Sequence, residues 1–423
     1  MTEDADDHWH YASATTLRGA LQRGQGAAGA RVAARGAAPE LVLDCVRRDY
    51  RWDRQVDERT TYLVRLVLDV GLPVDPIVDQ LWRTGRTSGY DGNRFGQSVD
   101  LLAALARTGV PAAKDALRRY VGEGEQWIEV LQAVAGAWPG EWWDDLAPIV
   151  AGRAADAAPE EVFAGQDPWP AWAGRDRRID VLVGRARPAP ARRCPSLPHR
   201  GAPVDGLLGL LADPDAHPEL LSAVLHEFAR HRDPEPRLLE VADRLAARPD
   251  ARRIGLVRAL AKLGPRTVRH ARQWARSPAH PLWWTAVVTL TEHGTVADVP
   301  ALLAALDRLD RDRDDWCGYD ALARGFARLG VTEAAPRLRS LWHRSPHSYE
   351  RAAYVEALLT LDPDATRPLL PDALADCEGD VRMVAARHTP LTGEVRRRLG
   401  RLRDCPLENA DVRAAAARRL ASA

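Results

Sequence analysis

The chain has 423 residues, of which 59 are Lys or Arg and 59 are Asp or Glu, so its formal net charge is zero at pH 7. This balance argues against a dedicated nucleic-acid binder with a basic field over the whole chain, although a local basic groove stays open. No run approaches the roughly 18 apolar residues that a membrane-spanning helix needs. The acidic start, MTEDADDHWHY, is unlike a signal peptide, and we expect residues 1–14 to be a flexible tail of a cytoplasmic protein.

The cysteines are scattered and none belongs to a CxxC pair: Cys45, Cys194, Cys317, Cys377 and Cys405. This spacing predicts reduced cytoplasmic thiols, and we expect neither a bound metal nor a cofactor. Lysine is nearly absent while Ala, Arg, Gly and Pro are plentiful. Such a bias is typical of a GC-rich bacterial genome, so an arginine cluster in this chain needs further support before it indicates a binding site.

Residues 15–165 show apolar positions at helical spacing, grouped into pairs of helices with a short break inside each pair. In one pair, a stripe that includes Leu63 and Leu66 ends at Gly71, and a second helix follows over 76–82. The Gly-rich run 84–97 lacks the closing Gly-Lys-Ser/Thr of a phosphate-binding loop and is interpreted as a connection between helices.

Residues 166–203 interrupt this rhythm, since the segment contains seven prolines, eight arginines, Trp169 and Trp172. Helices do not run through such proline density, so we predict a linker or an ordered insertion, in which 179–183 can still form one helix turn or more. An insertion could also act as a lid over a binding site.

The helix pairs resume over 204–423 and end in a helix at 412–420 that is expected to cap the stack. Breaks fall at Gly264, Gly294, Gly330 and Asp362, which are 30, 36 and 32 residues apart. A period of this size indicates an array of helical pairs, because two amphipathic helices cannot bury their apolar stripes without stacked neighbours. Gly330 is predicted to adopt the left-handed conformation that ends a helix.

The pattern resembles the HEAT and armadillo class of α-solenoids. The Leu-Gly breaks at 263–264 and 329–330 carry this resemblance, together with Val299-Pro300 and Ala335-Pro336 early in the second helices. It implies an all-α fold: a right-handed α-solenoid of about 10–12 helical pairs with one insertion rich in Pro, Arg and Trp. The resemblance is architectural and brings no activity with it.

Two tryptophan doublets are candidate binding residues: Trp142-Trp143, followed by Asp144-Asp145, and Trp283-Trp284. Neighbouring residues of a helix point about 100° apart, so both members of a doublet cannot face the same part of the core. One member of each would then be exposed for binding. The competing interpretation is that both pack between repeats.

The HEAT-like alkylpurine DNA glycosylases are the enzyme class that uses this architecture, and they need a basic groove, exposed aromatic residues and a carboxylate. Residues 142–145 would supply the aromatic and acidic groups. Candidate groove arginines lie on second helices, which line the concave side of such solenoids: Arg269, Arg272, Arg276, Arg337 and Arg339. However, Asp298 and Asp307 interrupt this basic track.

Asp310, Asp312 and Asp314 have the spacing of a calcium loop, but the required Gly and closing Glu are missing, so the run is interpreted as a charged loop. These observations favour a non-catalytic scaffold that binds a protein or peptide along its concave surface. The alternatives are a DNA-binding protein of the glycosylase type and a binder of small molecules or modified peptides with residues 166–203 as a lid. Whether the chain catalyses a reaction stays open, and a membrane partner is not expected.

Overall fold

The computed structural model describes residues 11–35, 38–155, 157–186, 201–248, 253–311 and 317–422. All regular secondary structure within these ranges is helical, which confirms the all-α prediction. Parts of three predicted segments lie outside them: residues 1–10 of the tail, 187–200 of the insertion or lid, and 312–316 of the acidic loop. None of the described helices is both long enough and apolar enough to cross a membrane.

The chain forms two compact units, and the first contains both ends of the chain. Unit 1 comprises Met1–Ala189, Trp342–Val355 and Asp364–Ala423, whereas unit 2 comprises Pro190–Leu341 and Glu356–Pro363. The predicted segments 15–165, 166–203 and 204–423 are each one continuous stretch of the chain, whereas each unit combines separate stretches.

Most helices are short, and many begin at a proline or end at a glycine. The N-terminal part of unit 1 contains α1 (Leu17–Gln22), α2 (Gly26–Arg35), α3 (Pro39–Arg47), α4 (Thr60–Asp69), α5 (Asp75–Thr84), α6 (Gly92–Arg107), α7 (Pro111–Glu123), α8 (Trp127–Ala137), α9 (Ala147–Arg153), α10 (Trp169–Trp172) and α11 (Arg177–Ala186). Unit 2 contains α12 (Val204–Ala212), α13 (Pro218–His231), α14 (Leu238–Ala247), α15 (Arg253–Ala261), α16 (Val268–Trp274), α17 (Trp283–His293), α18 (Val299–Arg311) and α19 (Tyr319–Leu329).

Seven α-helices remain within the described ranges. The first three of them each contribute residues to both units, and the last four belong to unit 1. They are α20 (Ala335–Arg344), α21 (Arg351–Leu361), α22 (Pro363–Thr366), α23 (Leu370–Ala373), α24 (Gly379–His388), α25 (Gly393–Asp404) and α26 (Ala410–Ala421). Short 3-10 turns connect many of them: η1 (Thr87–Gly89), η2 (Gly140–Trp142), η3 (Asp144–Leu146), η4 (Pro159–Glu161), η5 (Gly264–Thr267), η6 (Val296–Asp298), η7 (Thr332–Ala334), η8 (Ser348–Glu350) and η9 (Arg367–Leu369).

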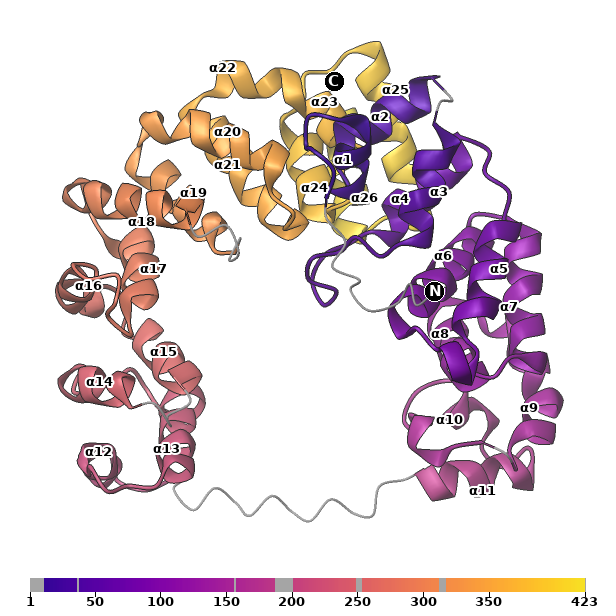
Figure 1. Cartoon of the computed structure of the whole chain (residues 1–423), viewed down its shortest axis with the longest axis horizontal. Coiled ribbons are helices and arrows are strands. Elements are labelled where there is room, and N and C mark those ends of the chain that lie inside the picture. Colours follow the sequence, from indigo (N-terminus) through magenta and orange to yellow (C-terminus); the bar gives the residue numbers. More distant parts are fainter. Residues whose placement is uncertain are drawn as a thin grey trace, which may run out of the picture. The chain divides into compact units, whose positions relative to one another are not determined.

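Unit 2 has two helix layers. In the first-helix layer α13 packs on α15 and α17 packs on α19, while in the second-helix layer α12 packs on α14, with α16 and α18 continuing the row (Figure 1). Consecutive helices cross from one layer to the other, as α14 to α15 and α16 to α17 do. Stacked helix pairs of this kind are what the 30-residue period predicts.

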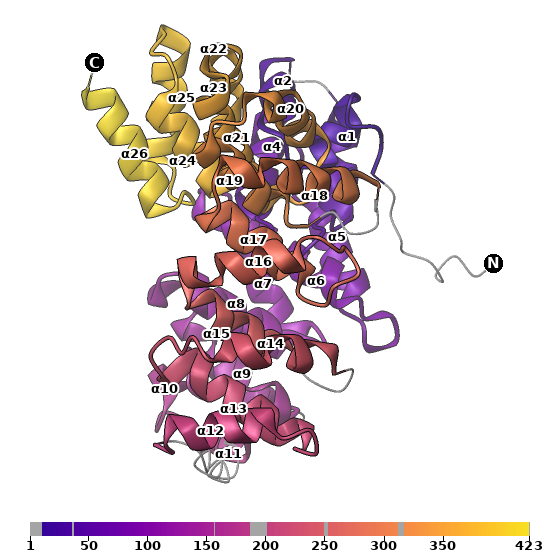
Figure 2. The same ribbon diagram turned by 90° about the vertical axis from the view of Figure 1, so that its left-hand side faces the viewer.

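Unit 1 repeats the alternation and then joins the two ends of the chain. Helix α4 packs on α6, α6 on α8, and α5 on α7. At the other end α26 packs on both α24 and α25 (Figure 2). The two ends meet where α2 packs on α23.

The break glycines and apolar stripes follow the sequence pattern in most places. Gly330 ends α19 in the left-handed region, with φ 70°, as predicted. Tyr319, Leu322 and Phe326 of the same helix are buried, which confirms its stripe. Gly294 instead ends α17 in an extended conformation, so not every break uses the left-handed conformation.

The segment from 169 to 186 is more helical than its prolines predict. Pro168 and Pro170 lie at the start of α10, where a proline ring is tolerated because the first amide groups of a helix have no intrahelical acceptor. Helix α11 contains no proline and buries Ile179 and Leu182. The position of each proline relative to the helix start therefore decides its effect.

Candidate functional site

The first tryptophan doublet, in unit 1, is mainly a packing element. Trp143 is buried, and its ring packs edge-on against Trp172 with 5.7 Å between ring centroids. Trp142 is half-buried, and the Lys114 ammonium lies 5.1 Å from its ring centroid. The doublet thus divides into one buried and one partly accessible ring, although it lies at the junction of two 3-10 turns and not in the α-helix that the prediction assumed.

The two aspartates beside this doublet are already engaged. Asp145 accepts hydrogen bonds of 2.8 and 2.6 Å from Arg118 of α7. Asp144 accepts from the indole Nε1 of Trp172 at 3.1 Å and from Arg175 at 2.6 Å. Both carboxylates therefore connect neighbouring helices, which leaves them poorly placed to act on a bound base.

The second doublet, in unit 2, is half-buried and contacts the start of the next repeat. The Arg308 guanidinium lies 5.1 Å from the ring centroid of Trp283. A Cβ atom on Gly318 would lie 2.3 Å from Cζ2 of Trp284, so that ring packs directly against the residue before α19.

Three of the five candidate arginines belong to a series of contacts that we call the aspartate ladder. In each contact an aspartate accepts a hydrogen bond from a residue of an adjacent repeat in unit 2. The contacts are Asp205–Arg237, Asp243–Trp274, Asp298–Arg272, Asp307 and Asp310–Arg337, and Asp362–Arg339. Arg269 of α16 and Arg276, which follows the end of that helix, are exposed and have no partner within the described ranges.

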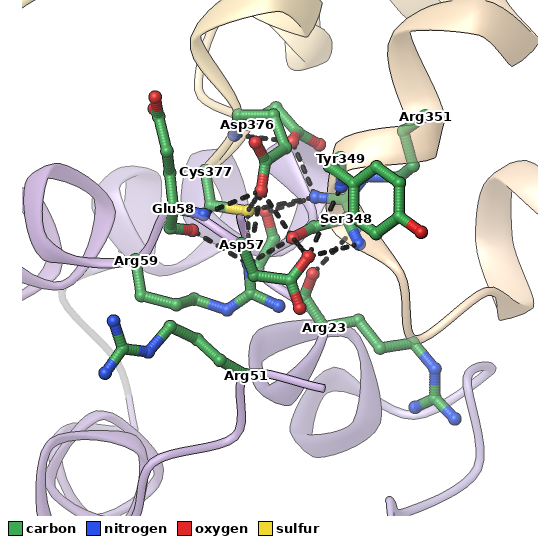
Figure 3. Close-up of polar contacts among 12 residues, drawn as sticks. Arg23, Arg51, Asp57, Glu58, Arg59, Ser348, Tyr349, Arg351, Asp376 and Cys377 are labelled. Atoms are coloured by element: carbon green, nitrogen blue, oxygen red, sulfur yellow. Dashed lines mark hydrogen bonds and ion pairs between the residues drawn. The ribbon is translucent and has the colours of Figure 1, made fainter. Parts of the chain in front are cut away.

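A larger polar assembly lies in unit 1, where no candidate had been predicted. We call it the junction cluster, and it consists of Arg23, Asp57, Glu58, Arg59, Ser348, Arg351, Asp376, Cys377, Glu378, Arg382 and Glu408. All of these except Glu58 are buried. Figure 3 shows that Arg59, from the N-terminal part of the chain, and Arg351, from the C-terminal part, both reach the Cys377 sulfur.

Backbone contacts bring these loops together. The Cys377 amide donates to the Gly24 carbonyl at 2.9 Å, and the Gly26 amide donates to Asp376 at 3.2 Å. Gly24 has a φ of 68°, and a Cβ atom there would lie 2.5 Å from the Cys377 sulfur. Only glycine satisfies both the left-handed backbone and this close approach.

Arg351, at the start of α21, is fully buried and connects the two ends of the chain. Its Nη2 donates to Asp376 at 2.6 Å and to the Cys377 sulfur at 3.1 Å. Its Nη1 donates to the Arg23 carbonyl at 2.9 Å. A buried charge needs this combination of an ion pair and hydrogen bonds to offset its lost hydration.

Arg59 approaches the same sulfur from the N-terminal side. Its Nη1 lies 2.6 Å from the Cys377 sulfur and 2.9 Å from the Ser348 hydroxyl. That hydroxyl also lies 2.7 Å from Asp57 and within hydrogen-bonding distance of Glu378. One hydroxyl hydrogen cannot be donated to two carboxylates, so one of the two acids holds a proton.

The cluster contains a second buried ion pair, between Arg382 and Glu408. Arg382 of α24 forms a bidentate pair with Glu408, with Nε and Nη2 donating at 2.9 and 2.7 Å. Arg65 of α4 donates to the same carboxylate at 2.5 Å. Glu408 is therefore shared between a C-terminal arginine and an N-terminal one.

Burial decides the protonation of the central groups. Burial raises the pKa of the Cys377 thiol well above its ordinary value, although Arg59 and Arg351 oppose the shift. Burial likewise raises the pKa of Glu378 to about 7, against the opposing charge of Arg59. Burial also acts to raise the pKa of Glu408, but the hydrogen bonds and charge of Arg382 outweigh it and hold that pKa below its ordinary value.

These shifts assign roles within the cluster. Glu378, whose pKa burial raises to about 7, can take up a proton beside Ser348, and the Ser348 hydroxyl donates to Asp57 at 2.7 Å. Cys377 is a neutral, inaccessible thiol and lacks the electropositive, partly exposed setting of a reactive cysteine. The arrangement can hold two chain segments together and can take up or release a proton, and nothing in its geometry offers Cys377 as a nucleophile.

Sequence reasoning missed this cluster because its members are scattered along the chain. The one local signal is the run Asp376-Cys377-Glu378, where two acids flank a cysteine between two apolar helices. The helical pattern on either side of this run indicates that it is covered by the stacked helices. Charged side chains are uncommon at buried positions unless they are paired with other polar groups.

Among the described residues, no group of three or more His, Cys, Asp and Glu side chains has the geometry to hold a metal ion. Comparisons with protein-family models, with curated proteins and with solved structures found no match to the chain. The resemblance to HEAT and armadillo repeats therefore remains an expectation from the residue pattern.

Proposed function

We propose that the chain is a non-catalytic helical-repeat scaffold that binds a protein or peptide partner on the second-helix layer of unit 2. The observation that supports this most directly is the aspartate ladder. Its contacts join residues 23 to 32 positions apart, about one repeat, and so fix each second helix relative to its neighbour. A surface held in place before binding loses little conformational entropy when a partner docks.

The ladder also bears on what kind of partner fits this surface. Arg272 donates to Asp298 at 2.8 and 2.9 Å, and Arg337 donates to two acids at 2.6 Å each. Paired arginines offer little net charge to a phosphate backbone, whose binding depends on uncompensated cations. A surface of mixed, paired charges suits the polar rim of a protein interface.

The nucleic-acid alternative has weaker support. Its acidic candidates, Asp144 and Asp145, are engaged by Arg175 and Arg118. Among its basic candidates, Arg269 and Arg276 are the ones without a ladder partner. Two exposed cations, one on α16 and one just after it, make a small footprint for DNA.

The test is affinity purification of the full-length chain from a lysate of its source organism at about 0.1 M and 0.5 M salt. We expect a protein partner to be retained at both concentrations. The double variant Arg269→Glu/Arg276→Glu, on the second-helix layer, is expected to lose it. Arg230→Glu/Arg258→Glu, which reverses two exposed charges on α13 and α15 of the first-helix layer, is the matched control and is expected to retain it.

Two outcomes would overturn the proposal. One is that only nucleic acid is retained and that it dissociates at the higher salt concentration. The other is that the two double variants behave alike, because the partner would then not distinguish the two layers.

A further inference from the structure

Unit 1 contains a pocket beside the junction cluster that the proposed scaffold function does not use. The pocket has a volume of about 400 Å³ and lies between helices from opposite ends of the chain. Helices α2 and α4 form one side, and α25 with the residues after α23 forms the other. Its size is that of sites for small organic ligands.

Part of the pocket lining is apolar, and small residues of α2 contribute to it. Leu66, Leu374 and Leu402 line it, and α2 contributes Gly29 and Ala33. A Cβ atom on Gly29 would lie 3.1 Å from the Tyr62 ring, so a larger residue there would press on the wall. This part of the pocket can accommodate a hydrocarbon group.

Three arginines line the polar part, and two of them have unused donors. Arg65 donates through Nη2 to Glu408, but its Nη1 is buried and has no partner. Arg401 of α25 is exposed and has neither a hydrogen bond nor an ion pair with a described residue. Arg398 differs, since Glu394 and the Pro371 carbonyl occupy its donors.

Two acids also line the pocket and offset part of this charge. Glu394 is paired with Arg398 at 2.8 Å. Asp69 is half-exposed, and burial raises the pKa of its carboxyl while the charges of Arg401 and Arg65 oppose that shift. Arg401 is thus the accessible cation of the lining, and Arg65 Nη1 is a buried donor left without a partner.

We propose that this pocket binds a small amphipathic organic anion, with its carboxylate or phosphate on Arg65 and Arg401 and its apolar part against Leu66 and Leu402. Guanidinium groups with free donors match both head groups, and buried donors gain most from such a partner. Because the walls come from both ends of the chain, a bound anion stabilises the closed junction. A ligand that binds the folded state alone raises its stability by mass action.

The full-length chain can be tested with octanoate and octyl phosphate as probes, and with octylamine and octanol as controls. Calorimetric titration gives the affinity, and the thermal midpoint reports stabilisation. We expect one or both anions to bind and to raise the midpoint, whereas the amine and the alcohol do neither. The preferred anion identifies the head group as carboxylate or phosphate, and either result supports the proposal.

Variants of exposed residues keep the test independent of folding. Arg401→Gln is expected to weaken anion binding by about tenfold or more, which is the typical value of a charged hydrogen bond. Arg396→Gln is the matched control, because it removes the same charge from an exposed position of the same helix outside the pocket. Asp69→Asn is expected to tighten anion binding, since it removes a competing negative charge.

Cys405 offers an independent measurement because it lines the pocket and is half-buried. The alkylation of Cys405 can be monitored by mass spectrometry of each variant. We expect this alkylation to slow when octanoate or octyl phosphate is bound. The proposal is overturned if neither anion binds at millimolar concentration, if octylamine binds as tightly, or if Arg401→Gln and Arg396→Gln behave alike. None of these results affects the proposed scaffold surface, which belongs to unit 2.

Discussion

The aspartate ladder of unit 2 and the junction cluster of unit 1 both join helices through arginines and acids, but at very different sequence distances. Ladder partners such as Asp307 and Arg337 are 30 positions apart, whereas Glu58 and Glu378 in the cluster are 320 apart. Ladder side chains such as Arg337 and Asp307 are partly exposed, while Arg351 and Asp376 are fully buried. The same residue types therefore hold neighbouring repeats together in unit 2 and join distant parts of the chain in unit 1.

This difference predicts different energetic consequences. An exposed ion pair is screened by water and contributes little to stability. A buried pair has already lost its hydration, so removal of one partner leaves a costly unpaired charge. Four variants or conditions, taken from the largest expected effect to the smallest, test this contrast.

The largest effect is expected for Arg351→Met, which leaves Asp376 buried without its cation. We expect the free energy of unfolding of unit 1 to fall by about 3–5 kcal/mol. Urea denaturation, combined with hydrogen exchange of α2 and α24, measures the loss and shows whether the two chain ends separate. A loss below about 1 kcal/mol would mean that Arg351 does not hold the junction.

The next effect is a pH dependence that belongs to Glu378. Its pKa is raised from 4.5 to about 7 in the folded protein, so the folded state holds the proton more tightly than the unfolded state. This contribution is fully present below pH 4.5 and is lost as the pH rises through 7, which amounts to about 3 kcal/mol. Unfolding measured at several pH values should show this slope, and Glu378→Gln should remove it. An unchanged slope in that variant would assign the titration to another group.

Gly24→Ala should have an intermediate effect. The substitution forces a side chain into the left-handed region and places its Cβ against the Cys377 sulfur. We expect a loss of about 2 kcal/mol or more. Gly109→Ala is the control, since φ there is 92° but no atom lies within 4 Å of the added Cβ. Equal losses, measured by denaturation, would indicate that backbone strain alone matters and that the junction is not tightly packed.

The smallest effect is expected in the ladder. Arg337→Gln removes two ion pairs of 2.6 Å, but the arginine and its partners are about a third or more exposed. The free energy of unfolding should fall by less than about 1 kcal/mol. A loss as large as that of Arg351→Met would remove the distinction between the two regions.

The sequence alone determined the helical repeat. The spacing of Gly264, Gly294 and Gly330 and the stripe through Leu322 and Phe326 are local patterns, and helix formation and nearest-neighbour stacking depend on local patterns. The all-α fold and the left-handed Gly330 could therefore be predicted. For 166–203 the sequence left a linker and an ordered insertion open, because the effect of a proline depends on the helix boundary, which is the least certain feature of a sequence.

Only the tertiary structure decided where the chain ends meet and which polar residues become buried there. Gly24, Arg59, Arg351 and Cys377 carry no shared periodicity, since contacts between residues hundreds of positions apart leave no trace in a local pattern. Their protonation depends on desolvation, and desolvation exists only once α2 and α23 have packed together. The same packing creates the pocket at Arg65, because its walls come from both ends of the chain.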